Sequence, residues 1–280
     1  MPEPSPLLTG IAFPESPRWH DGRLWFSDWV THQVIAVDTA GDSEVIAEVD
    51  AFPFSFDWLP DGRMLVTAGP EVLRLEPDGS LATHADLREL AEHGLNEIVV
   101  DGHGNTYVNG AGFDLMGGGD PAPGLVILIR PDGSLQRVAG EVAFPNGMAV
   151  TPDNSTLIVA DSYGNELIGF DIAADGSLAN RRTWADLGDG VPDGICLDSG
   201  GAVWYADVPN RRCARVAEGG EELGSVELDR GCFACILGGA DGRTLFMMAQ
   251  EWAGPEAIGT GPRTGQVVTT EAPAPHAGYP

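Results

Sequence analysis

The chain has 280 residues, and its 42 acidic side chains outnumber 15 Lys and Arg, giving a formal net charge of −27 at pH 7. Such a charge repels a polyanion, and phosphate contacts need Lys and Arg, so the composition excludes nucleic acid as a partner. No apolar run approaches the roughly 18 residues of a membrane helix, and no signal-like segment opens the chain, so we expect no membrane association and a cytoplasmic location.

Short apolar runs joined by tight turns recur along the whole chain. Each unit begins with a five-residue segment, called here a head, whose fifth residue is apolar. The heads begin, in chain order, at Glu15, Ser55, Asn96, Asn146, Asp193 and Phe233. Each head is followed by a turn, usually Asp-Gly or Asp-Asn, and then by a second apolar run. Because those turn residues tolerate positive φ, each head and its second run predict a β-hairpin. The second runs are 24–26, 64–66, 106–108, 157–159, 203–205 and 245–247.

A second turn signal completes several units. Asp-Gly-Ser segments follow the second runs within 77–80, 131–134 and 175–177, which indicates four strands per unit. Successive heads lie 40, 41, 50, 47 and 40 residues apart, and propeller blades repeat at about 40–50 residues. The sequence therefore predicts an all-β fold, a six-bladed β-propeller with four antiparallel strands per blade, occupying 1–280 as a single domain.

Other folds explain the pattern less well. Alternating strands and helices would need amphipathic segments of about 10–15 residues, and only Ala85–His93 has a helical pattern. A β-sandwich is possible but does not account for a six-fold repeat. Cys232 and Cys235 have the spacing of a zinc or redox motif, yet Cys235 lies within a head, on a strand expected between blades. We therefore favour buried packing for these thiols.

The first residues of the heads predict a site. In a propeller the innermost strands line the central channel, so equivalent positions should form a ring at one mouth. Glu15 and Asp193 bring carboxylates to this ring, and Asn96 and Asn146 bring amide oxygens. Donors that are all oxygen suit hard cations such as Ca²⁺, Mg²⁺ or Mn²⁺. The alternative is that these polar side chains only hydrate the channel mouth.

Three segments carry a family resemblance. They are Phe-Pro-Glu-Ser-Pro-Arg-Trp at 13–19, Phe-Pro-Asn-Gly-Met at 144–148 and Val-Pro-Asp-Gly-Ile at 191–195. In this order and spacing they resemble the SMP-30/gluconolactonase/LRE family, also called regucalcin-like, from about Gly10 onward. The resemblance implies a six-bladed propeller with one divalent metal in its channel. It further implies Glu15, Asn146 and Asp193 as metal ligands and Asn96 as a substrate contact beside them.

The resemblance also implies an activity. Members of the family hydrolyse lactones, typically sugar lactones, so we expect a metal-dependent lactonase acting on a small-molecule lactone or ester. Asp193 would be both ligand and catalytic base. Ca²⁺ is the expected cation, with Zn²⁺, Mn²⁺ and Mg²⁺ as alternatives. A phosphotriester hydrolase and a non-catalytic calcium-binding propeller remain the competing functions.

One departure from the family concerns the substrate. Many sugar lactonases carry Arg two residues before the position of Asn96, whereas this chain has Gly94, which favours a less polar lactone or ester. The loop 110–124 could be an apolar lid, carrying Phe113, Leu115 and Met116, or an ordinary long blade loop. His93 could be an auxiliary acid or base, or a surface residue. The remaining substrate-side candidates are Asn109, Phe113, Phe233 and Trp19.

Overall fold

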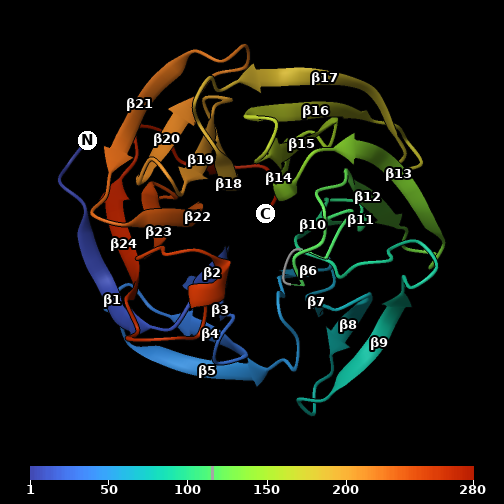
Figure 1. Cartoon of the computed structure of the whole chain (residues 1–280), viewed down its shortest axis with the longest axis horizontal. Coiled ribbons are helices and arrows are strands. Elements are labelled where there is room, and N and C mark those ends of the chain that lie inside the picture. Colours follow the sequence, from blue (N-terminus) through green and yellow to red (C-terminus); the bar gives the residue numbers. More distant parts are fainter. Residues whose placement is uncertain (115–116) are drawn as a thin grey trace.

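A computed structural model describes residues 1–114 and 117–280. Six antiparallel sheets surround a central channel (Figure 1), so the predicted six-bladed β-propeller is confirmed. From the channel outward, the first three blades are β2 (Pro14–His20), β3 (Arg23–Asp28), β4 (Gln33–Val37) and β5 (Ser43–Glu48); β6 (Phe56–Trp58), β7 (Met64–Ala68), β8 (Glu71–Leu75) and β9 (Leu81–Asp86); and β10 (Ile98–Val100), β11 (Thr106–Gly110), β12 (Gly124–Ile129) and β13 (Leu135–Val142).

The other three blades follow the same plan. They are β14 (Pro145–Val150), β15 (Thr156–Asp161), β16 (Glu166–Ile172) and β17 (Leu178–Asp186); β18 (Pro192–Asp198), β19 (Val203–Asp207), β20 (Arg212–Val216) and β21 (Glu222–Glu227); and β22 (Gly231–Gly238), β23 (Thr244–Gln250), β24 (Gly265–Glu271) and β1 (Ser5–Ile11). A short 3₁₀ helix, Pro255–Ala257, lies between β23 and β24.

Both ends of the chain are tied into the ring. The outermost strand of the sixth blade is β1, which pairs with β24 so that Ser5 faces Thr269. At the other end, β25 (His276–Ala277) pairs with β18 and gives the fifth sheet a fifth strand. Tyr279 then pairs with Val150 of β14. The C-terminal segment therefore lies at the centre of the ring (Figure 1), where it links the fourth and fifth blades.

Strand alternation builds the core between blades. In β15, Leu157 and Val159 belong to one buried cluster, and Ile158 and Ala160 belong to the next. Successive side chains point to opposite faces of a strand, so each inner strand packs against both neighbouring blades. Central strands are therefore apolar on both faces.

The segment Ala85–His93, which has a helical pattern in the sequence, does not form a helix. Ala85 and Asp86 end β9, where Ala85 pairs with Val72, and turns follow. Leu87 and Ala91 are buried in the core of this region, and the Leu87 amide donates to the carbonyl of Pro70. Tertiary packing has overridden the local helical pattern. Within the described residues, no helix has the length and apolarity needed to cross a membrane.

The four cysteines lie together between the fifth and sixth blades. Cys196, Cys213, Cys232 and Cys235 are free thiols, all buried in one apolar cluster. The Cys196 and Cys235 sulfurs are 4.0 Å apart. Burial raises the pKa of Cys196, Cys213 and Cys232, which disfavours their reactive thiolate form.

We expect no native thiol to react with 5,5′-dithiobis(2-nitrobenzoate) within minutes, because the reagent cannot reach any of them. In denaturant all four should react. Absorbance at 412 nm with and without guanidinium chloride measures both values. Fast labelling of a native thiol would contradict the buried placement.

Candidate active site

Four oxygen-bearing head residues meet at one mouth of the channel. Glu15 lies in β2, Asn146 in β14 and Asp193 in β18, and Asn96 precedes β10. All four line one cavity of about 720 Å³, together with Phe233 of β22. The structure therefore places these four residues next to one another, as their equivalent positions in the repeats predict. The remaining head residue, Ser55, points instead to the Glu97 carboxylate, to which its hydroxyl donates at 2.9 Å.

Buried aspartates fix the segments that carry two of these residues. Asp28 ends β3 and accepts the amides of Ala12 at 3.1 Å and Phe13 at 2.9 Å. Asp161 ends β15 and accepts the amides of Ala143 at 2.8 Å and Phe144 at 2.9 Å. The same device therefore holds the Phe-Pro step before Glu15 and the Phe-Pro step before Asn146.

Asn109 supports the ring rather than lining the cavity, so its expected substrate contact is not borne out by its position. Its side chain is fully buried. The Asn109 amide donates to the carbonyl of Asn146 at 2.6 Å, and its oxygen accepts the Glu97 amide at 3.2 Å. The side chain of Asn96, by contrast, lines the cavity and lies 3.4 Å from that of Asn146.

Trp19 does not belong to the cavity, which corrects its expected substrate contact. It lies four positions after Glu15, and because a strand rises about 3.3 Å per residue, it lies far along β2 from the polar ring. Its ring stacks on Phe246 with the centroids 5.4 Å apart. Gly238 makes room for the indole, because a Cβ there would lie 2.4 Å from it.

The surroundings of the two ring carboxyl groups, Glu15 and Asp193, disfavour their ionised forms. Burial raises the pKa of Glu15 well above its usual range, and the neighbouring Asp193 and Glu97 raise it further. Burial and Glu97 likewise raise the pKa of Asp193, against a hydrogen bond from Asn146. Among the described residues, no Arg or His forms an ion pair with either carboxylate. The ring therefore carries uncompensated negative charge when both groups ionise.

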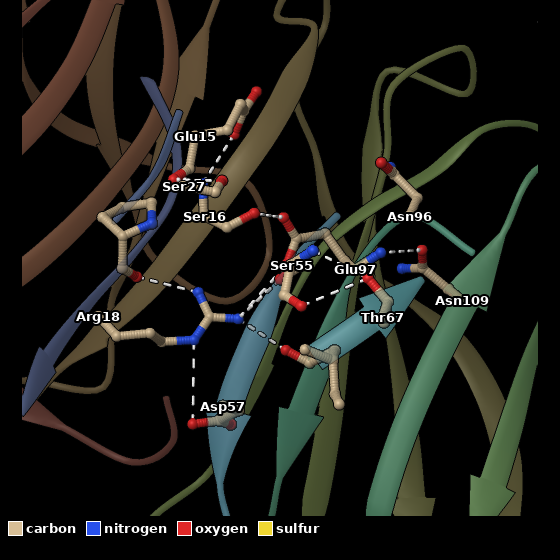
Figure 2. Close-up of polar contacts among 12 residues, drawn as sticks. Glu15, Ser16, Arg18, Ser27, Ser55, Asp57, Thr67, Asn96, Glu97 and Asn109 are labelled. Carbon is tan, nitrogen blue, oxygen red and sulfur yellow. Dashed lines mark hydrogen bonds and ion pairs between the residues drawn. The ribbon is translucent and has the colours of Figure 1, made fainter. Parts of the chain in front are cut away.

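A charged network lies under the ring (Figure 2). The Glu97 carboxylate accepts hydrogen bonds from Ser16 at 2.8 Å and from Ser55, and Arg18 approaches it at 3.4 Å. Arg18 also donates to the carbonyl of Ile98 at 2.7 Å and lies 3.9 Å from Asp57. Burial raises the pKa of Asp57 to about 6, although Arg18 opposes the shift. One guanidinium thus faces two buried carboxyls.

The backbone of Ser16 couples this network to the ring. Its φ of 48° is left-handed, a conformation uncommon in residues other than glycine. In it the Ser16 amide donates to the Glu15 carboxylate at 3.0 Å while the hydroxyl donates to Glu97. Sequence reasoning missed Arg18, Asp57 and Glu97. A comparison of the six heads position by position would have found them, because each is a charged residue where the other heads have uncharged ones.

The walls of the cavity above the ring are apolar. One wall, called here the first aromatic wall, consists of Phe13, Trp29, Phe52, Phe233 and Trp252. The second aromatic wall consists of Phe113, Phe144 and Tyr163. His93, Gly94 and Asp114 also line the cavity. Phe113 and Phe233 therefore face the site as predicted, whereas Leu115 and Met116 of the expected lid lie outside the described residues.

Residues 13–251 match the family model described as the SMP-30/gluconolactonase/LRE-like region. The chain belongs to this family. Among members of the SMP-30/gluconolactonase/LRE-like family, regucalcin of Gallus gallus is 27% identical over 94% of this chain and 94% of its own length. The 6-deoxy-6-sulfogluconolactonase of Pseudomonas putida is 25% identical over 95% and 93%.

The fold is shared with a solved structure of low sequence identity. A luciferin-regenerating enzyme superposes with a TM-score of 0.84 at 19% identity, over 99% of this chain and 98% of that one. This likeness shows that the two chains share the propeller fold.

Proposed function

We propose that the protein hydrolyses a lactone with the help of one divalent cation held by Glu15, Asn146 and Asp193. The observation that carries the proposal is the convergence of two carboxylates and two amides in the lining of one cavity of about 720 Å³. These four residues are called here the floor of the cavity. A lactonase among the relatives, which aligns over nearly the whole chain, supports the same activity.

The residues present fit a cation. In the described part of the chain, no group of three or more His, Cys, Asp or Glu side chains forms a metal cluster, so the donors are two carboxylates completed by amide oxygens. This set suits a hard cation, and Ca²⁺ first. The Asp193 carboxylate raises the pKa of Glu15, and Arg18 is already engaged with Asp57 and Glu97. A divalent cation would cancel the remaining charge.

The reaction needs water, a base and an orienting group. A bound cation would polarise the lactone carbonyl and acidify a bound water. Asp193 accepts the proton of the attacking water, and the Asn96 amide donates to the developing oxyanion. The water oxygen bonds to the acyl carbon and the ring C–O bond breaks. The leaving alkoxide takes the proton that Asp193 accepted, and the hydroxy acid so formed releases one proton at neutral pH.

A titration assay separates this function from its alternatives. The purified chain would be given glucono-1,5-lactone, an alkyl δ-lactone and a phosphotriester at constant pH, with and without chelator. The proposal expects lactone hydrolysis that stops on chelation and returns with Ca²⁺ or Mn²⁺. Chelator-insensitive lactone turnover would refute the metal role, phosphotriester turnover alone would favour the phosphotriester hydrolase, and no turnover would favour a binding propeller.

The ring carboxylates also predict how stability depends on pH and cations. Because the pKa values of Glu15 and Asp193 are raised in the folded state, folding favours their protonated forms. In chelator, the free energy of unfolding should therefore fall as pH rises from about 4 through the raised pKa values. A cation at 100 times its dissociation constant adds about 2.7 kcal/mol, which corresponds to a Tm increase of about 5 °C at pH 8.

Differential scanning calorimetry between pH 4.5 and 8, with EDTA or Ca²⁺, measures both effects. Glu15→Gln is the matched variant, since it keeps the shape of the side chain. It should flatten the pH dependence in EDTA and lose most of the response to Ca²⁺. An equal Ca²⁺ response in the variant would place the cation elsewhere.

A further inference from the structure

The first aromatic wall is a continuous line of ring contacts over the ring of polar residues. Phe13 lies at its centre, stacked on Trp29 at 5.4 Å and edge-on to Phe233 at 5.0 Å. Phe52 extends the line beyond Trp29 at 5.5 Å, and Trp252 extends it beyond Phe233, also at 5.5 Å. Phe13 adjoins the Pro14-Glu15 step, and Phe233 is itself a head residue. The wall therefore rises directly from the catalytic floor.

The second aromatic wall stands on the same cavity, on the third and fourth blades. Phe144 is central, 6.0 Å from Phe113 and stacked on Tyr163 at 4.7 Å. It adjoins the Pro145-Asn146 step, as Phe13 adjoins Pro14-Glu15. The central residue of each wall therefore lies two positions before a proposed cation ligand, Phe13 before Glu15 and Phe144 before Asn146.

Apart from the four floor residues, the described lining residues with polar side chains are His93, Asp114, Ser162 and Tyr163. Among the described lining residues none is Arg or Lys, and the position expected to carry Arg is Gly94. A sugar hydroxyl placed against Phe13 or Phe144 would lose its hydrogen bonds to water without replacement. The volume of about 720 Å³ lies in the range of pockets that take drug-sized apolar ligands, about 300–1,000 Å³.

We infer that the substrate is a lactone whose ring carries an apolar chain or aryl group, with the ring at the polar floor and the apolar group between the two aromatic walls. The inference rests on the proposed lactone hydrolysis. Removal of apolar surface from water would supply the affinity, and the floor would orient the carbonyl. Trp252 and Tyr163, at the outer ends of the two walls, determine how long a chain is favoured.

A series of δ-lactones tests the inference. It runs from δ-valerolactone through δ-hexalactone and δ-decalactone to δ-dodecalactone, with glucono-1,5-lactone for comparison. We expect kcat/KM to rise roughly fourfold per added methylene until the cavity is filled, and glucono-1,5-lactone to be a poor substrate. A kcat/KM for glucono-1,5-lactone above that of every alkyl lactone would overturn the inference while leaving lactone hydrolysis intact.

Variants of exposed wall residues test which surface is used. Trp252 is 42% exposed and Tyr163 is 53% exposed, so Trp252→Ala and Tyr163→Ala leave the core packed. Each should lower the ratio of kcat/KM for δ-dodecalactone to that for δ-valerolactone roughly tenfold. Leu223→Ala, at an equally exposed position on β21 (43%), is the matched control and should leave the ratio unchanged. An unchanged ratio in both wall variants would contradict the inference.

Binding without chemistry separates the two proposals. The ether 2-heptyltetrahydropyran has the shape of δ-dodecalactone but no carbonyl to hydrolyse. Its binding, measured by calorimetry, should be tighter than that of tetrahydropyran and should weaken in Trp252→Ala. If no lactone is hydrolysed yet this pattern appears, the proposed reaction fails and the apolar-ligand site stands. If lactones are hydrolysed but the ether binds no better than tetrahydropyran, the inference fails alone.

Discussion

Replacing Asp193 with Asn is expected to lower kcat/KM for lactone hydrolysis roughly 10⁴-fold while the fold is retained. The substitution keeps the size of the side chain but removes the base, for which losses of about 10²–10⁴-fold are usual, and it weakens the cation site as well. Because the Asp193 carboxylate raises the pKa of Glu15, loss of the Asp193 charge should not destabilise the chelated protein. Steady-state kinetics with a δ-lactone and circular dichroism measure the two effects.

Asp189→Asn is the matched control for this variant. Asp189 is exposed and lies four residues earlier in the same chain segment, but it does not line the cavity. Its replacement should leave kcat/KM within twofold of the wild-type value. Activity of Asp193→Asn within tenfold of the wild-type value would exclude Asp193 as the base and return the assignment of that role to another cavity residue, such as His93.

Replacing Arg18 with Met is expected to lower the free energy of unfolding by about 3–5 kcal/mol, the usual cost of removing one partner from a buried ion pair. Arg18 is 6% exposed and compensates both Glu97 and Asp57. Without Arg18, the Glu97 and Asp57 carboxyl groups stay buried with no positive partner, next to the carboxylates of Glu15 and Asp193. Urea unfolding followed by tryptophan fluorescence measures the loss.

Two further variants show whether charge is the cause. Arg63→Met removes an exposed Arg that pairs with Asp61 at the surface, and such pairs contribute about 0–1 kcal/mol. In the double variant Arg18→Met/Glu97→Gln, part of the lost stability should return, because one uncompensated charge is gone. A loss in Arg18→Met no larger than in Arg63→Met would show that the network does not stabilise the fold.

The sequence repeat made both the propeller fold and the ring of polar head residues predictable, because both depend on the spacing of equivalent positions along the chain. A hairpin signal at a fixed spacing specifies a blade, and equivalent positions in a closed ring share one height. The same logic placed Glu15, Asn96, Asn146 and Asp193 together. The same reasoning failed for Trp19. This residue is close to Glu15 in sequence, but it lies too far along β2 to reach the cavity and packs on Phe246 instead.

Contacts between blades could not be read in the same way. Arg18, Asp57 and Glu97 come from three successive blades, and only their joint burial makes them one network. Asn109 was expected on the substrate side because it lies at the end of the second strand of its blade, on the same face as the polar ring. The structure instead turns its side chain to the Asn146 carbonyl and the Glu97 amide. Local patterns also suggested a helix over Ala85–His93, where burial of Leu87 and Ala91 decided otherwise.

The pairing of β1 with β24 has a consequence for how the protein is made. Ser5 and Thr269 face each other in the last blade, so β1 must wait for its partner β24, which is synthesised much later. Contacts so distant in sequence slow folding. Until they form, the sixth blade keeps an unpaired edge that can recruit another chain. The propeller is therefore most prone to aggregate during its synthesis, before β1 and β24 have paired.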